Sequence, residues 1–209
     1  MPDNTAQPRE YMMKRQSFHA MQVVKREEKE TRLVQFVLGE IASGRVALTG
    51  QWCVVALSMD SPVIAGLRRV VQDLGGASAL QVNVVLTRLG KHDPADGFGD
   101  VDGLAIRTTQ NSRILDAHEQ LVLGPASSWT GDCMRRDPRE RDAFETFGSN
   151  DTELAQWALK SFERIWVGAQ PLKGVIKRST VADRDAGIDT LVAGDGATDS
   201  PLVAATSRH

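Results

Sequence analysis

The sequence predicts an α/β fold built on a mixed sheet that is flanked by helices. An apolar run over residues 52–58 has the length of a buried strand, and residues 63–74 carry apolar side chains at helical spacing. A second apolar run, rich in valine, follows over 80–86. This strand–helix–strand order predicts two parallel strands covered by the connecting helix. A hairpin pattern over 113–123 adds antiparallel strands, which makes the sheet mixed.

The helix of this unit has signals at both ends. Asp60 and Ser61 can cap its N-terminus, and Pro62 suits the first helical position because the N–H that proline lacks has no helical partner there. Gly75 and Gly76 follow the last apolar position and predict the end of the helix. The positions expected to face the sheet are Val63, Leu67, Val70, Val71 and Leu74.

A further helix is expected over residues 28–43, as part of an N-terminal helical segment over 9–44. Gly44 is well placed as its C-cap, and the polar residues 1–8 are expected to be disordered. The charge run over 25–30 is expected to form the solvated face of this helix. The apolar positions at helical spacing are Leu33, Phe36, Val37 and Ile41.

The main domain is expected over residues 45–172 and closes with a helix that Asn150 or Asp151 caps. Residues 173–209 are polar and irregular, which predicts a flexible, disordered C-terminal tail. The remaining strands are expected over 104–108, 113–115, 120–123 and 143–147, with a turn over 116–119. The apolar positions of the closing helix include Leu154, Trp157, Leu159, Phe162 and Trp166.

The composition is that of an ordinary soluble globular protein. Hydrophobic residues make up 41% of the 209 residues, charged residues make up 25%, and the formal net charge is -2. Proteins that coat nucleic acid in general are basic, so this class does not fit. Cys53 and Cys133 follow no disulfide or zinc spacing, and no apolar leader opens the chain, which predicts a cytoplasmic protein. No metal, cofactor or membrane span is expected.

Several stretches resemble motifs of the phospholipase D superfamily. In that family a strand with His-x-Lys leads to an Asp at a hairpin turn, and an apolar return strand then leads to Gly-Ser-x-Asn. Here Asp116 stands at the turn, and residues 124–130 take the place of Gly-Ser-x-Asn. The stretch over 141–145 is similar to the family's Asp-x-Glu strand, which makes Glu145 a candidate carboxylate. Residues from about 50 to 172 thus resemble one lobe of this superfamily.

The resemblance implies a reaction that this chain is not equipped to perform. The family uses two histidines, one that attacks phosphorus and one that protonates the leaving oxygen, while the lysine of each motif holds phosphate oxygens. In this alignment the histidine should fall within 108–110 and the lysine within 111–113, where Arg113 is the one basic residue. We therefore expect a catalytically inactive domain with a binding or regulatory role.

The resemblance also implies partners and a binding site. A one-lobe member pairs with a second copy of itself, so we expect a homodimer, and a phosphorylated ligand or nucleic acid could bind to it. Trp129 suits core filling as well as ligand contact. The expected ligand-binding residues follow the Gly-Ser-x-Asn place and are Gly124, Ser127, Ser128, Trp129 and Thr130.

His118 supports an alternative function as a divergent dimeric phosphodiesterase or nuclease. If the hairpin of the family is shortened, His118 takes the motif position and Glu119-Gln120 replaces x-Lys. Arg113 would then hold the phosphate, and Asp116 and Glu145 remain as accompanying carboxylates. This alignment loses the lysine, and it gives up the match at Asp116.

A third hypothesis is a DNA-binding regulator that uses its N-terminal segment as a basic arm. The overall charge counts against it, but a local patch of cations would be enough to bind phosphates. The basic residues of this segment are Arg9, Lys14, Arg15, Lys25 and Arg26.

Overall fold

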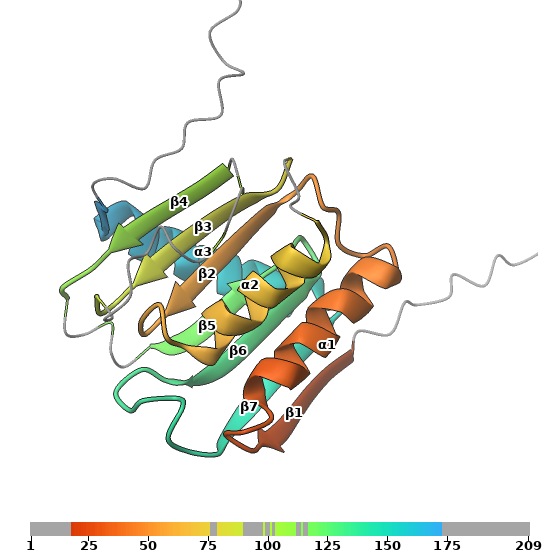
Figure 1. Cartoon of the computed structure of the whole chain (residues 1–209), viewed down its shortest axis with the longest axis horizontal. Helices are drawn as coiled ribbons and strands as arrows, with labels where there is room; N and C mark the ends of the chain where they lie inside the picture. The colour runs from red at the N-terminus through yellow and green to blue at the C-terminus, as the bar shows by residue number, and fades with distance from the viewer. Residues whose placement is uncertain are drawn as a thin grey trace, which may run out of the picture. The chain divides into compact units, whose positions relative to one another are not determined.

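Eight strands form one sheet, and helices pack on both of its faces (Figure 1). The computed structural model describes residues 18–75, 79–89, 98, 101, 103–111, 114 and 117–172. These residues all lie in a compact unit, Met1–Ser179. The expected disordered start and C-terminal tail lie outside the described residues, and so does most of the loop that precedes residue 103.

The strands run in the spatial order β1-β7-β6-β5-β2-β3-β4-β8. Their bounds are β1 Phe18–Val24, β2 Gln51–Ala56, β3 Gln81–Leu86, β4 Gly103–Thr108, β5 His118–Val122, β6 Ser127–Cys133, β7 Ala143–Ser149 and β8 Gln170–Pro171. The helices of the described part are α1 Lys29–Ala42, α2 Pro62–Asp73 and α3 Thr152–Gly168.

The predicted strand–helix–strand unit is confirmed as β2-α2-β3. β2 and β3 pair in parallel, β4 continues the parallel set, and β5 pairs with β2 in the antiparallel sense, so the sheet is mixed. Ser61 is the N-cap of α2, Pro62 is its first residue, and Gly75 follows the helix with a φ of 70°. A positive φ is costly for residues with a Cβ, which explains a glycine at this stop.

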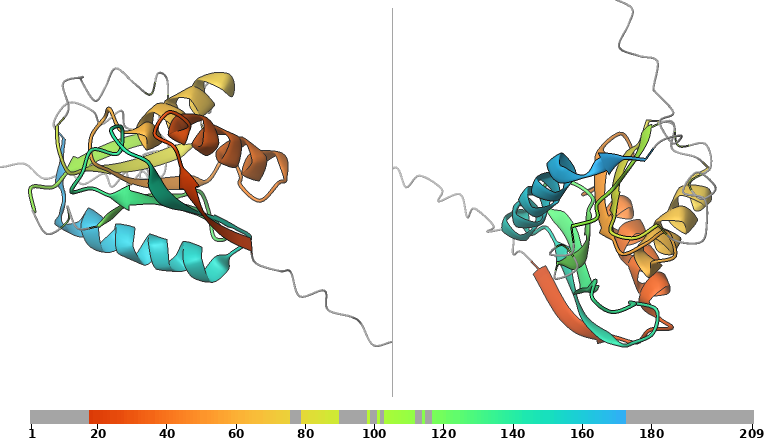
Figure 2. Two further views of the ribbon diagram at one scale, coloured as in Figure 1. Left: turned by 90° about the horizontal axis from the view of Figure 1, so that it is seen from below. Right: turned by 90° about the vertical axis from the view of Figure 1, so that its left-hand side faces the viewer.

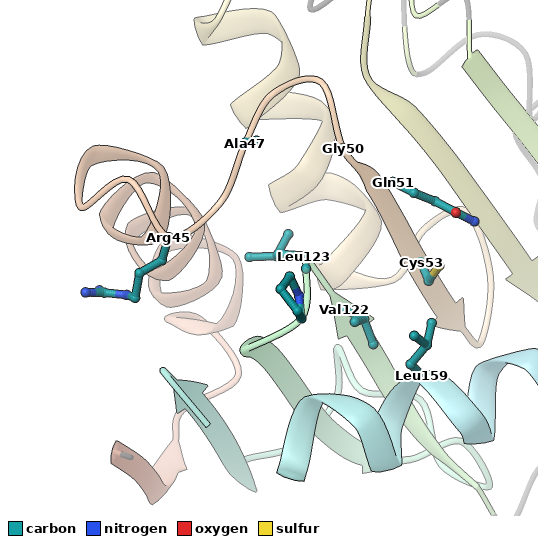
Figure 3. A pocket seen from close by; sticks show the side chains of 10 residues that line it. Arg45, Ala47, Gly50, Gln51, Cys53, Val122, Leu123 and Leu159 are labelled. Carbon is teal, nitrogen blue, oxygen red and sulfur yellow. The ribbon is translucent and has the colours of Figure 1, made fainter. Parts of the chain in front are cut away.

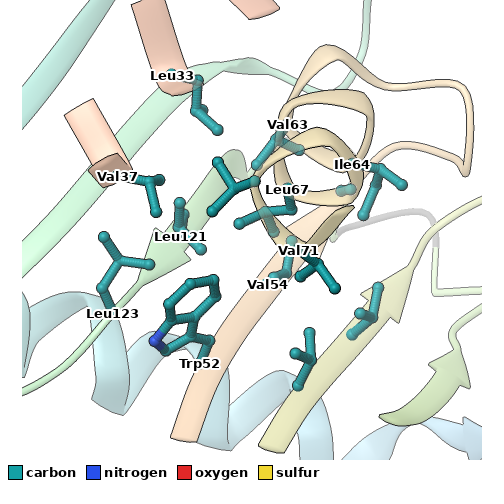
Figure 4. Packing of buried hydrophobic residues seen from close by; sticks show 14 of the residues in the cluster. Leu33, Val37, Trp52, Val54, Val63, Ile64, Leu67, Val71, Leu121 and Leu123 are labelled. Carbon is teal, nitrogen blue, oxygen red and sulfur yellow. The ribbon is translucent and has the colours of Figure 1, made fainter. Parts of the chain in front are cut away.

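The two faces of the sheet carry separate cores. α1 and α2 cover one face, and α3 lies on the other (Figure 2). Under α2, Leu67 packs toward Trp52 and Val54 of β2 (Figure 4). Under α3, Val122 and Phe162 belong to a smaller buried cluster. α3 packs mainly against β2, β5 and β6, so part of this face beyond β6 stays open.

Helix α1 confirms the prediction for residues 28–43, but the stretch before it is not helical. Phe18–Val24 is strand β1, which pairs with β7 along its full length from Phe18↔Ser149 to Val24↔Ala143. The helical prediction for this part of residues 9–44 is therefore wrong. β7 offers unpaired backbone groups at its edge, and β1 satisfies them, which no local periodicity reveals.

No helix in the described part of the chain has both the length and the apolar character that a membrane span requires.

Candidate functional site

Strand β5 places His118 and Gln120 on the face of the sheet that α3 partly covers. Side chains alternate along a strand, so Glu119 and Leu121 point to the opposite face. His118 begins the strand, which means that the predicted turn over 116–119 is wrong at its last two residues. The expected partner strand over 113–115 is described only at Ile114, which is 3₁₀-helical and not part of a strand.

The chain returns from β5 as strand β6, and the two strands pair antiparallel. Residues 127–130, which belong to the stretch aligned with Gly-Ser-x-Asn, are part of strand β6. His118 and Gln120 lie across from Cys133 and Thr130, with a register shift between them. The hairpin observed in this region is thus formed by β5 and β6, one strand later than the expected hairpin over 113–123.

A cavity of about 490 Å³ opens beside His118, between the sheet and α3. β5 contributes His118 and Gln120, β6 contributes Thr130 and Gly131, and α3 contributes Ser161. We call this cavity the His118 pocket. Among the residues that line it in the described part of the chain there is no lysine, arginine, aspartate or glutamate.

The imidazole of His118 is held by one hydrogen bond. Its Nδ1 lies 2.8 Å from the carbonyl oxygen of Gly131. A carbonyl oxygen only accepts, so Nδ1 donates in this hydrogen bond, and a neutral imidazole in this tautomer carries its lone pair on Nε2. This orientation suits a group that accepts a hydrogen bond or attacks an electrophile.

Gly131 is required by the neighbouring tryptophan. A Cβ at this position would lie 2.6 Å from Cζ2 of Trp129, which is closer than real Cβ contacts allow. The ring of Trp129 therefore crosses the backbone of β6 at Gly131. The same residue supports the core on one face and holds His118 through its carbonyl on the other.

Gln120 is buried, and only the nitrogen of its side-chain amide forms a hydrogen bond within the described part of the chain. Its side chain is 4% exposed, and Nε2 donates a long hydrogen bond of 3.4 Å to Oγ of Ser161. Oε1 has no hydrogen-bond partner among the described residues. Sequence reasoning passed over Gln120 as a site residue, although its place two residues after His118 in a strand puts both side chains on one face.

Three exposed apolar side chains line the His118 pocket, from Met21, Phe144 and Trp157, and a fourth, from Val23, lies beside Phe144. Met21 and Val23 of β1 are 70% and 58% exposed, and Phe144 of β7 and Trp157 of α3 are 68% and 64% exposed. Val23 and Phe144 are direct partners in the β1–β7 ladder. We call these four residues the apolar rim. Trp157 is one of the apolar positions expected in the closing helix, but the buried face of α3 is formed by Ala155, Ala158 and Phe162.

The opposite face of β5 holds a buried set of charges. Nζ of Lys29 donates to the carbonyl oxygen of Pro138 at 2.9 Å and lies 3.7 Å from Oε1 of Glu145. Nε1 of Trp129 donates to Oε2 of Glu145 at 2.9 Å. Oε1 of Glu119 accepts from the backbone N–H of Leu57 at 3.0 Å. Lys29 is 2% exposed, so its expected place on a solvated helix face is wrong.

Burial governs the ionisation of both carboxylates. Burial raises the pKa of Glu119 to about 7, against the opposing hydrogen bonds from Leu57 and Ser61. Burial likewise raises the pKa of Glu145, against the hydrogen bond from Trp129 and the charge of Lys29. Glu145 therefore belongs to a closed internal cluster, on the face away from His118, and the two candidate residues do not share a site.

Ser127 belongs to a second internal cluster, around Glu40 of α1. The hydroxyls of Ser127 and Ser149 donate to the Glu40 carboxylate, the latter at 2.8 Å, and Nη2 of Arg45 lies 2.8 Å from Oε1. Burial alone would raise the pKa of Glu40, but the hydrogen bonds from Arg45 and both serines outweigh it and hold the pKa below its ordinary value. These contacts tie α1 to β6 and β7, which is a structural role.

The other expected ligand-binding residues are spread over the fold. Ser128 is fully buried, Trp129 is 2% exposed in the core, and Thr130 lines the His118 pocket. Gly124 lines a different cavity of about 390 Å³, which apolar side chains dominate (Figure 3). Arg113 and Asp116 lie outside the described residues.

The thiol of Cys53 also faces this second cavity. Burial raises the pKa of Cys53 to about 12, which keeps the thiol protonated and unreactive near neutral pH. The second cavity therefore offers little chemistry.

Comparisons with known proteins place the fold. No protein-family model matches the sequence, and no curated protein does. NucT from Helicobacter pylori is similar in structure, with a TM-score of 0.51 and 9% sequence identity over 75% of this chain and 100% of the other.

Two further solved structures are similar over a comparable part of the chain. Nuc from Salmonella typhimurium, a phospholipase D family member, has a TM-score of 0.47 and 15% identity over 74% of this chain and 99% of the other. TrmBL2, an archaeal DNA-binding chromatin protein, has a TM-score of 0.47 and 8% identity over 77% of this chain and 56% of the other. The expected phospholipase D-like α/β fold is confirmed.

Proposed function

We propose that this chain is a binding protein on a phospholipase D-like fold that does not hydrolyse phosphodiesters. The observation that carries the proposal is Gln120. It stands two residues after His118, in the place where the family's reaction needs a lysine. A neutral amide cannot balance the charge that develops on phosphate oxygens, and no cation lines the pocket among the described residues.

The geometry supports His118 over residues 108–110 as the counterpart of the motif histidine. Residues 108–110 comprise the last residue of β4 and the two that follow it, and two strands, β2 and β3, separate β4 from β5. His118 instead begins a strand that enters a hairpin, and it lines a cavity. Both alignments lack the lysine, so the proposal of a non-hydrolytic protein does not depend on the choice between them.

An assay of phosphodiester hydrolysis tests this proposal directly. Bis-p-nitrophenyl phosphate should be hydrolysed by the purified chain no faster than by buffer, and His118→Ala should not change this result. Turnover that is present in the native chain and lost in His118→Ala would overturn the proposal.

The proposed assembly is a homodimer formed through the apolar rim. Four large apolar side chains that are each more than half exposed are unusual around one pocket, and a second copy would remove them from water. Such a dimer would also bring two His118 pockets toward each other. Phe144→Lys should shift the mass in light scattering from dimer to monomer. Val167→Lys is the matched control, because Val167 is 82% exposed but lies outside the rim.

A divergent dimeric phosphodiesterase is the second candidate function. The hydrogen bond from Nδ1 of His118 to Gly131 favours it, because it leaves Nε2 open for attack on phosphorus. Arg113 would then have to supply the positive charge. Hydrolysis that depends on both His118 and Arg113 would establish this function in place of the first.

A DNA-binding regulator remains the third candidate. Lys25 and Arg26 are exposed between β1 and α1, and the other cations of the basic segment lie outside the described residues. Contacts to phosphates release counterions. The affinity for duplex DNA should therefore fall steeply as the salt concentration rises from about 50 to about 200 mM, and the fall should be larger the more phosphates the arm contacts. Binding that is insensitive to salt would exclude a basic arm.

A further inference from the structure

We propose that strand β1 is the dimer contact of this chain, where it pairs edge to edge and antiparallel with β1 of a second copy. This inference rests on the proposed homodimer and gives it a geometry. The two sheets would join into one continuous sheet across the contact, with Met21 on the two-fold axis. The backbone edge of β1 carries the inference.

Strand β1 lies at one end of the sheet, and β7 is its only strand neighbour among the described residues (Figure 1). In an antiparallel pair, alternate residues direct both their N–H and their C=O toward the partner strand, and the residues between them direct theirs away. About half of the backbone groups of β1 therefore point to its outer side. An edge of this kind is a template for another strand.

The two ends of the sheet differ in how they are protected. Proteins shield edge strands by keeping them very short, or by placing proline, lysine or a β-bulge in them. β8 is such a strand, since it has two residues and one of them is Pro171. β1 has seven residues, and none is lysine, arginine, aspartate, glutamate or proline. It also pairs with β7 without a break in register, so β1 keeps the features that favour pairing with a further strand.

Three properties of β1 favour a second copy as the strand that pairs with it. An antiparallel pair centred on Met21, the middle residue of Phe18–Val24, leaves no position of either strand over. The two copies meet without like charges across the contact, because the strand carries no ionised carboxylate, lysine or arginine. The edge is also continuous with the apolar rim, because Met21 and Val23 belong to both.

The symmetry of such a pair decides which faces come together. The two-fold axis between two antiparallel edge strands runs through the sheet at right angles to it, so α3 of both copies lies on the same side. Val24 is buried in the core under α1 and α2, so Met21 and Val23 point to the α3 side. Met21 would then contact Met21 of the partner subunit, and the two apolar rims would form one surface.

Disulfide cross-linking of the full chain tests the register. With Met21 on the axis, the two Cα atoms at position 21 lie about 4.5–5.5 Å apart, within reach of a disulfide. Met21→Cys should therefore form a covalent dimer when a thiol oxidant such as diamide is added. The native chain, which has Cys53 and Cys133, sets the background.

Val23→Cys is the matched control on the same strand and the same face. In this register position 23 lies opposite position 19 of the partner subunit. The two copies of position 23 are therefore offset by about 13 Å along the strand, which is too far for a disulfide. Val23→Cys should cross-link no more than the native chain.

Opposite charges at position 21 test whether the two side chains face each other. Met21→Lys and Met21→Glu should each shift the mass in light scattering from dimer to monomer at low salt, because like charges meet on the axis. An equal mixture of the two variants should be dimeric, since lysine then faces glutamate. Met21 is 70% exposed, so neither variant risks the fold. Leu89→Lys, at a position that is 64% exposed and follows β3, is the control and should remain dimeric.

The outcomes separate this inference from the proposed function. A dimer that Met21→Cys does not cross-link would overturn the edge pairing, and so would cross-linking of Val23→Cys in its place. A dimer that Met21→Lys leaves intact, or a mixture of the charged variants that stays monomeric, would also overturn it. A monomeric native chain would overturn the homodimer and this inference together. None of these results bears on hydrolysis, and only His118-dependent turnover of bis-p-nitrophenyl phosphate would overturn the non-hydrolytic function.

Discussion

The two faces of strand β5 differ in how completely their polar atoms are paired. On the face under α1 and α2, Glu119 accepts a hydrogen bond from the N–H of Leu57. Glu145 accepts one from Trp129 and forms an ion pair with Lys29. On the face toward α3, the amide oxygen of Gln120 has no partner among the described residues, and His118 is held through Nδ1 by the carbonyl oxygen of Gly131. Neighbouring residues of β5 therefore have different surroundings. Side chains alternate along a strand, so one set points into a closed core and the other toward a pocket.

The difference indicates where to look for function in this fold. Lys29, Glu119 and Glu145 are held in internal hydrogen bonds and an ion pair, so they stabilise the domain and are not available to a ligand. The neutral polar atoms are the ones left open. Four substitutions can break or sharpen this comparison, and they follow in order of expected effect.

Lys29→Met should cause the largest loss of stability. It removes the cation beside Glu145 and the donor to Pro138, and breaking a buried ion pair by removing one partner typically costs about 3–5 kcal/mol. Urea unfolding measures the loss. Lys25→Met, at an exposed position before α1, should change the free energy of unfolding by less than about 0.5 kcal/mol. A loss in Lys29→Met as small as in this control would show that the cluster is not closed.

Glu119 should make stability depend on pH in a defined direction. Its pKa is raised from 4.5 to about 7 in the folded state, so the folded chain binds the proton more tightly than the unfolded chain. Its contribution is full below pH 4.5 and is lost as the pH rises to about 7, which corresponds to about 3 kcal/mol.

Glu119→Gln should remove most of this loss, because the amide oxygen can still accept from Leu57 and carries no charge. Unfolding by urea at pH 5 and pH 8 in the native chain and the variant measures the difference. Glu27→Gln, at an exposed position, should retain the full pH dependence. Identical pH profiles for the native chain and Glu119→Gln would contradict the assignment.

Gly131→Ala should destabilise the fold by about 1–3 kcal/mol, since the added methyl group overlaps the Trp129 ring. Displacement of that ring should also change near-ultraviolet circular dichroism. Gly124→Ala is the matched control, because a Cβ there meets nothing within 4 Å. Retained stability and an unchanged spectrum in Gly131→Ala would mean that the two faces are not joined through this residue.

Gln120→Leu should have the smallest effect on stability, and in the opposite direction. It replaces a buried unpaired acceptor with an apolar group of similar size, so the free energy of unfolding should rise by up to about 1 kcal/mol. Gln156→Leu, at an exposed position of α3, is the control and should change little. A clear loss of stability in Gln120→Leu would show that Oε1 is satisfied in the folded protein.

The local elements were predictable because their signals lie close together in the sequence. The β2-α2-β3 unit has its apolar runs, its Ser61-Pro62 start and its Gly75 stop within 36 residues of each other, 51–86. The Asp151 cap of α3 is equally local, with its carboxylate accepting from the N–H of Leu154 at 3.0 Å. The absence of a His-x-Lys sequence was also evident, because no histidine of the chain is followed by a lysine two positions later.

Tertiary structure decided which side chains meet, and this determined the site. β1 is a strand because β7 offers it an edge, and Lys29 is buried because Pro138 and Glu145 come to it from distant parts of the chain. Trp157 faces outward because smaller residues take the buried side of α3. The sequence alone therefore determined the fold class and the absence of a His-x-Lys sequence. The pairing of polar atoms on the two faces of β5 depends on contacts between distant residues, which local patterns do not encode.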